Sequence, residues 1–136
     1  MRIPSTIALL LATIICVPAL HGQEGKEKTG VHSAELFAST VADAGSKEIT
    51  VLDVRYAPGG VNPRHFHPAA VTFHVLAGTP VFQEDGKAPV MLKPGDSLLI
   101  PAGTTHAHWN PSTSEGARWL EFIVAEKGKG RAIRKP

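Results

Sequence analysis

Short hydrophobic segments separated by Gly- and Pro-containing turns run through most of the chain, from residue 48 to residue 126. The segments recur at intervals of about 8 to 12 residues and are rich in β-branched and aromatic side chains. They include ITVLDVRY, VTFHVLAG and ARWLEFIVAE, and the turns between them include APGG, EDGK and KPGD. No long 3.6-residue periodicity follows residue 45, which argues against βαβ units. The pattern predicts an all-β sandwich or barrel.

The first 22 residues differ in composition from the rest of the chain. Arg2 is the only charged residue before Glu24, and an apolar run over residues 6–20 is followed by small and polar residues. This layout is typical of a secretory signal peptide, here cleaved after Gly22, and the run is short for a transmembrane helix. An uncleaved membrane anchor is the alternative, and the bulky residue before Cys16 disfavours lipidation there. We therefore expect a periplasmic or secreted protein.

Two polar segments flank the predicted barrel, which we place at residues 47–126. Residues 23–46 form an N-terminal arm, in which SAELFAST is either a short helical turn or extended. Residues 127–136 form a basic tail, which we expect to be solvated. The formal net charge of +2 indicates neither a nucleic-acid partner nor an acidic membrane surface. The only cysteine lies in the first 22 residues, so the remaining fold has no disulfide.

His65 and His67 stand one residue apart in the stretch PRHFHPAAVTFHVLAG. Side chains two apart on a strand point to the same face, so both imidazoles can bind one metal ion. Two ordinary half-buried histidines are the alternative interpretation of such a pair.

A second cluster lies in PGDSLLIPAGTTHAHWNP. A turn, a hydrophobic strand and a second Pro/Gly turn bring His106 to the start of another strand. The spacing indicates a rigid hairpin that fixes the direction of the His106 side chain.

Together the two clusters resemble the motifs of the cupin family. The first motif, G-x5-H-x-H-x3,4-E-x6-G, is matched by Gly59, His65, His67 and Gly78, and the second, G-x5-P-x-G-x2-H-x3-N, is matched by Gly95, Pro101, Gly103, His106 and Asn110. The resemblance covers roughly residues 47 to 126. It implies a small antiparallel β-barrel of jelly-roll type, a metal ion inside the barrel, and a homodimer.

The chain departs from the family at the motif glutamate, which falls on Val71. His74 does not replace it readily, because Val71, Phe73 and Val75 share the apolar face of the strand and His74 lies on the other face. His108 shares a face with His106 and is a possible substitute ligand or a residue behind the ligands. His32 is expected to have no role, and His21 would leave with the signal peptide.

The resulting hypothesis is a three-histidine metal site formed by His65, His67 and His106. Three protein ligands leave coordination positions open for water, dioxygen or substrate, as in catalytic sites. Imidazole suits Fe, Ni, Cu and Zn, and Mn occurs with harder ligands, so the metal is not identified. Without the carboxylate, such a centre should favour an anionic ligand. We expect either a metal-dependent, dioxygenase-type enzyme acting on a small organic molecule or a non-catalytic binding protein with a weak or empty metal site.

Overall fold

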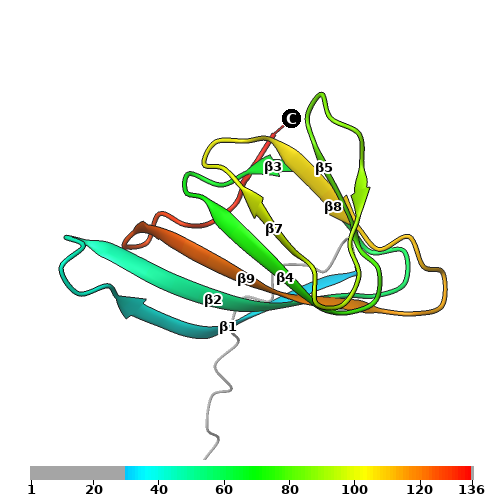
Figure 1. Cartoon of the computed structure of the whole chain (residues 1–136), viewed down its shortest axis with the longest axis horizontal. Helices are drawn as coiled ribbons and strands as arrows, with labels where there is room; N and C mark the ends of the chain where they lie inside the picture. The colour runs from blue at the N-terminus through cyan, green and yellow to red at the C-terminus, as the bar shows by residue number, and fades with distance from the viewer. Residues whose placement is uncertain (1–29, 136) are drawn as a thin grey trace, which may run out of the picture.

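The computed structural model describes residues 30–135, which form two antiparallel five-stranded sheets packed face to face as a jelly-roll barrel (Figure 1). The first sheet has the order β1-β2-β9-β4-β7 and the second the order β10-β3-β8-β5-β6. The strands are β1 Val31–Thr40, β2 Lys47–Tyr56, β3 Val61–Phe66, β4 Val71–Ala77, β5 Val81–Glu84, β6 Val90–Met91, β7 Ser97–Ile100, β8 His106–Trp109, β9 Ala117–Glu126 and β10 Ile133–Arg134. The all-β jelly-roll prediction is confirmed.

The core lies between the sheets, where the alternating side chains of the long strands meet. Along β4, the buried residues are Val71, Phe73 and Val75, and the residues between them are partly exposed. β9 alternates in the same way, with Trp119 and Ile123 buried. Because each strand directs every second residue inwards, one face of each sheet is apolar and the other meets solvent.

The segments before and after the predicted barrel both join the sheets. SAELFAST is extended within β1, which pairs with β2 along its length, with one register shift between Glu35 and Phe37. Figure 1 shows these two strands reaching beyond the second sheet. The segment expected to be a solvated tail returns to the barrel instead, where β10 pairs with β3. The position of this segment is determined by backbone hydrogen bonds to β3, which its basic composition does not predict.

The predicted signal peptide, residues 1–22, lies outside the described residues. Within residues 30–135 there is no helix that could cross a membrane.

Candidate metal centre

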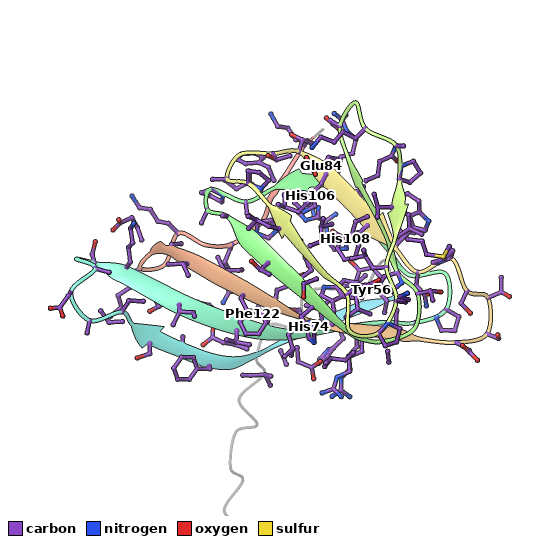
Figure 2. The ribbon with its side chains drawn as sticks, viewed as in Figure 1. Tyr56, His74, Glu84, His106, His108 and Phe122 are labelled. Carbon is purple, nitrogen blue, oxygen red and sulfur yellow. The ribbon has the colours of Figure 1, made fainter. Side chains whose placement is uncertain are left out.

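Four histidines meet inside the barrel, on and beside the two central strands of the second sheet. His65 on β3 lies directly opposite His106 on β8, and His108 follows on the same face of β8. His67 lies just after β3, and all four side chains are buried. Figure 2 shows His106 and His108 between the two sheets. Strand pairing thus brings together the two clusters that are about 40 residues apart in sequence.

The Nε2 atoms of His65, His67, His106 and His108 are all buried and have no hydrogen-bond partner among the described residues. Ring donor atoms of His65, His106 and His108 lie within 4.8 Å of one another. The His67 ring centroid is 5.2 Å from that of His65 and 5.5 Å from that of His106. Buried polar atoms normally have partners, so four unpartnered nitrogens in one place indicate a missing common partner such as a metal ion.

The opposite ring nitrogen, Nδ1, shows which histidines present a lone pair to that partner. Nδ1 of His65 is 2.8 Å from the Pro63 carbonyl oxygen, and Nδ1 of His106 is 2.9 Å from the Thr104 carbonyl oxygen. Nδ1 of His67 is 3.3 Å from the carbonyl oxygen of Gly130. A carbonyl oxygen only accepts hydrogen bonds, so we assign the proton of each neutral ring to Nδ1. Each Nε2 then carries the lone pair that a metal ion requires.

His108 differs from the other three because its Nδ1 faces a hydroxyl group. Tyr56 Oη lies 2.6 Å from His108 Nδ1. Burial raises the pKa of Tyr56, so its hydroxyl keeps its proton, and we assign it as the hydrogen-bond donor to His108 Nδ1. In this assignment the proton of His108 is at Nε2, which makes Nε2 a hydrogen-bond donor and not a metal ligand.

Distance and hydrogen bonding therefore favour different third ligands. The compact group contains His65, His106 and His108, whereas the carbonyl contacts select His65, His67 and His106. We give more weight to the hydrogen bonds, since a small rotation of the His67 ring changes its Nε2 position, whereas a ligand without a lone pair cannot bind.

Burial lowers the pKa of all four histidines, and that of His65 falls to about 4. The neighbouring imidazoles lower the pKa of His65, His67 and His108 by a smaller amount. The rings are therefore neutral near pH 7, which is the form that binds metals.

The structure places the two remaining predicted positions on opposite faces of β4. Val71 is fully buried in the core, so β4 contributes no carboxylate to the histidine cluster. His74 lies on the outer face, where Nδ1 is 2.9 Å from Ser97 Oγ of β7. His74 is thus separated from the four buried histidines by the sheet itself.

Other motif residues shape the loops around the cluster. Gly103, at φ +75°, donates its backbone N–H to the His67 carbonyl oxygen at 2.8 Å, which links the loops that carry the two motifs. Asn110 donates to the carbonyl oxygens of Ala57 and Glu115, at 3.1 and 2.7 Å. Gly78 packs against the backbone of Gly116 and Ala117, where an added Cβ would lie 2.6 Å from the Gly116 carbonyl oxygen. These residues fix the conformation of the loops, and none of them is a candidate metal ligand.

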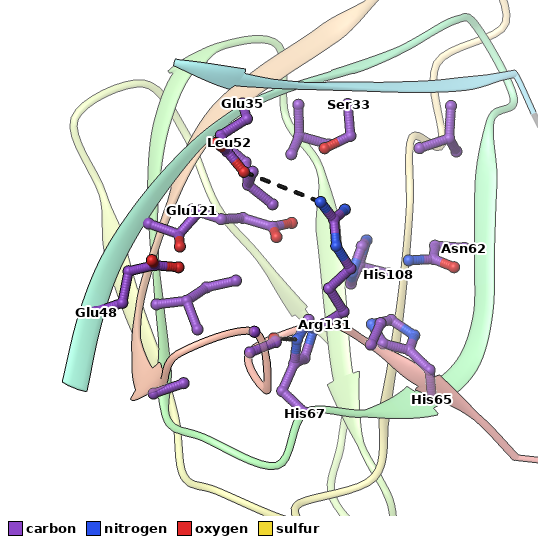
Figure 3. A pocket seen from close by; sticks show the side chains of 18 of the residues that line it. Ser33, Glu35, Glu48, Leu52, Asn62, His65, His67, His108, Glu121 and Arg131 are labelled. Carbon is purple, nitrogen blue, oxygen red and sulfur yellow. Dashed lines mark hydrogen bonds and ion pairs between the residues drawn. The ribbon is translucent and has the colours of Figure 1, made fainter. Parts of the chain in front are cut away.

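A cavity of about 370 Å³ opens beside the histidines, between the first sheet and the segment before β10 (Figure 3). His65, His67 and His108 line its inner end, together with Tyr56 and Asn62. The predicted tail forms part of its wall through residues 128 and 130–132.

Sequence reasoning did not identify Tyr56, Asn62, Glu121 or Gly130 as parts of this site. Only Glu121 had a visible signal, since it is a charged residue in the inward-facing positions of ARWLEFIVAE. The other three depend on pairings between distant strands.

Comparison with known proteins gives a family match and several relatives. Residues 52–125, more than half of the chain, match the family model described as "Cupin domain". A germin-like protein, subfamily T member 2, from Arabidopsis thaliana is 33% identical over 67 residues, which are 46% of this chain and 30% of the relative. The dimethylsulfoniopropionate lyase DddQ of Ruegeria pomeroyi is 42% identical over 55 residues, which are 40% of this chain and 27% of that protein. The matched segments thus span less than a third of either relative.

Among solved structures, a cupin-like protein from Thermotoga maritima has a similar fold. It superposes with a TM-score of 0.63 at 27% sequence identity, over 77% of this chain and 75% of that chain.

Proposed function

The chain belongs to the cupin family, and from this premise we propose that it is a metal-dependent enzyme with a three-histidine centre, acting on a small organic molecule. The observation that carries the proposal is the set of four buried, unpartnered Nε2 atoms at the end of a cavity. The DddQ relative, a dimethylsulfoniopropionate lyase, is an enzyme whose name gives a small organic substrate.

His65, His67 and His106 would hold the ion through Nε2, with Nδ1–H of each ring fixed by a backbone carbonyl. A bound Fe, Ni, Cu, Mn or Zn would supply Lewis-acid chemistry, and a redox-active metal would also permit oxygen-dependent chemistry of the dioxygenase type. Three protein ligands leave positions for a substrate, which would reach them through the cavity.

The remaining polar residues of the inner cavity have complementary roles in this proposal. His108, with Tyr56 behind it, would hold an N–H group at Nε2 that donates a hydrogen bond to an oxygen atom of the substrate. Tyr56 keeps that ring in place. Without a carboxylate at Val71, the three neutral ligands leave the ion's charge uncompensated, which favours an anionic group of the substrate at the metal.

The composition of residues 1–22 further supports export, and we propose a periplasmic or secreted location.

A non-catalytic binding protein is the second candidate, and the buried Val71 in place of the motif glutamate favours it. Metal analysis of protein purified from its native compartment separates the two. Stoichiometric Fe, Ni, Cu, Mn or Zn supports the enzyme, and substoichiometric metal of mixed identity supports the binding protein and contradicts our proposal.

A further inference from the structure

Glu121 on β9 is a carboxyl group buried in the wall of the cavity, on the same strand face as Trp119. It is only 6% exposed, and its Oε1 accepts a hydrogen bond from Trp119 Nε1 at 3.1 Å. Among the described residues, Oε2 has no hydrogen-bond partner and no cation pairs with the carboxyl group. Figure 3 shows the carboxyl end of Glu121 directed into the space that His108 and Arg131 also face.

Trp119 alone does not explain this carboxyl group. The amide oxygen of a glutamine would accept the indole N–H equally well, without the cost of burying an ionisable group. The second carboxylate oxygen of Glu121 accepts no hydrogen bond from the described residues, and the side chain lines the cavity, so this oxygen is available to a ligand that enters it.

The charges around the cavity indicate the sign of that partner. Four carboxyl groups line it, those of Glu35, Glu48, Glu121 and Glu126, against a single guanidinium, that of Arg131. Arg131 is 85% exposed, and its guanidinium pairs with Glu35 at 3.9 Å and not with Glu121. Low-dielectric walls strengthen the field of the carboxylates inside such a cavity, which attracts positive charge.

We propose that Glu121 binds a positively charged group of the small molecule that enters the cavity, and that the substrates of this site are organic cations such as protonated amines. This inference names a substrate class for the cavity and so rests on the proposed function. A molecule with an oxygen donor at one end and a cationic group at the other would satisfy both the metal centre and Glu121.

Three probes of similar size and different charge test the inference: butylammonium, butanol and butyrate. Each is titrated into the full chain after removal of metal, at about pH 8, and binding is followed by calorimetry. Because the protein is free of metal, a failure of the metal proposal does not affect the result. We expect butylammonium to bind at least about tenfold more tightly than butanol, and butyrate to bind least, since a charged hydrogen bond adds this much affinity.

Glu121→Gln should remove the preference for butylammonium over butanol while keeping the acceptor for Trp119. Glu115→Gln, which makes the same change in charge on an exposed loop away from the cavity, should leave the preference intact. The inference is overturned if wild-type protein binds butylammonium and butanol equally, a result that needs no variant. It is also overturned if Glu121→Gln keeps the preference, or if butylammonium binds only after Arg131→Gln, because Arg131 would then be the partner of Glu121.

Discussion

At the scale of single residues, hydrogen bonds assign different tasks to chemically identical side chains. His65, His67 and His106 each face a backbone carbonyl through Nδ1, whereas His108 faces the hydroxyl of Tyr56. The same imidazole thus presents a lone pair at Nε2 in three positions and an N–H group at Nε2 in the fourth.

Glu121 should make the fold less stable at neutral and alkaline pH. Burial raises its pKa from 4.5 to about 7, while Trp119 lowers it by a smaller amount. Because the folded protein favours the protonated acid, the stability that Glu121 contributes is fully present below about pH 4.5 and is lost as the pH rises through about 7. Glu121→Gln should therefore raise the free energy of unfolding at pH 8, on the order of 2 kcal/mol, with little effect at pH 4.

Urea denaturation of wild type and Glu121→Gln at the two pH values measures this difference, with Glu115→Gln as the control for net charge. An equal effect of Glu121→Gln on the free energy of unfolding at both pH values would mean that burial does not raise the pKa of Glu121.

At the scale of strands and loops, sequence reasoning was most successful where the information is local. The alternation in VTFHVLAG predicted correctly that Val71 faces the core and His74 faces outwards, because side-chain direction follows from strand geometry alone. The Gly/Pro turns likewise indicated the strands of the barrel. The contact of His67 with Gly130 and the pairing of β10 with β3 were not predictable, since they depend on where a polar tail returns in space.

The segment before β10 should contribute to metal affinity through Gly130. The carbonyl partners of His65 and His106 are two residues away in sequence, whereas that of His67 is 63 residues away. A Cβ at position 130 would lie 2.8 Å from Ile123 Cγ2, so Gly130→Ala should push the segment and its carbonyl away from His67. We expect about a tenfold loss of metal affinity, as for other residues that orient metal ligands.

Competition with a chelator of known affinity measures this loss, and Lys129→Ala, an exposed change in the same segment, is the control. Unchanged affinity in Gly130→Ala would show that the Gly130 carbonyl does not orient His67.

At the scale of the whole molecule, the outer face of the first sheet carries a row of four apolar residues and one threonine across its five strands. Register pairs Phe37, Val51, Phe122, Thr72 and Leu99 in sequence from β1 to β7. Phe37 is 52% exposed and Leu99 is 58% exposed, although soluble monomers seldom leave such rows uncovered. A two-fold axis would place this face against its own copy, so we propose that it forms a homodimer interface.

Leu99→Lys should convert the dimer into a monomer, because it places a charge in the apolar row. Val90→Lys on β6 of the other sheet, where Val90 is 48% exposed, should leave the dimer intact. Sedimentation equilibrium distinguishes the two forms. A monomeric wild type, or a dimer that only Val90→Lys disrupts, would contradict this interface.

The most direct test of the three-histidine centre is the ratio of zinc to protein after loading with Zn²⁺ and removal of excess metal, in wild type and five single alanine variants. His65→Ala, His67→Ala and His106→Ala each remove one of three ligands, so each should lose most of the bound zinc. Wild type, His74→Ala and His108→Ala should retain about one zinc ion per chain. Loss of zinc in His108→Ala together with full loading of His67→Ala would contradict the account, because the ligands would then be the compact group of His65, His106 and His108.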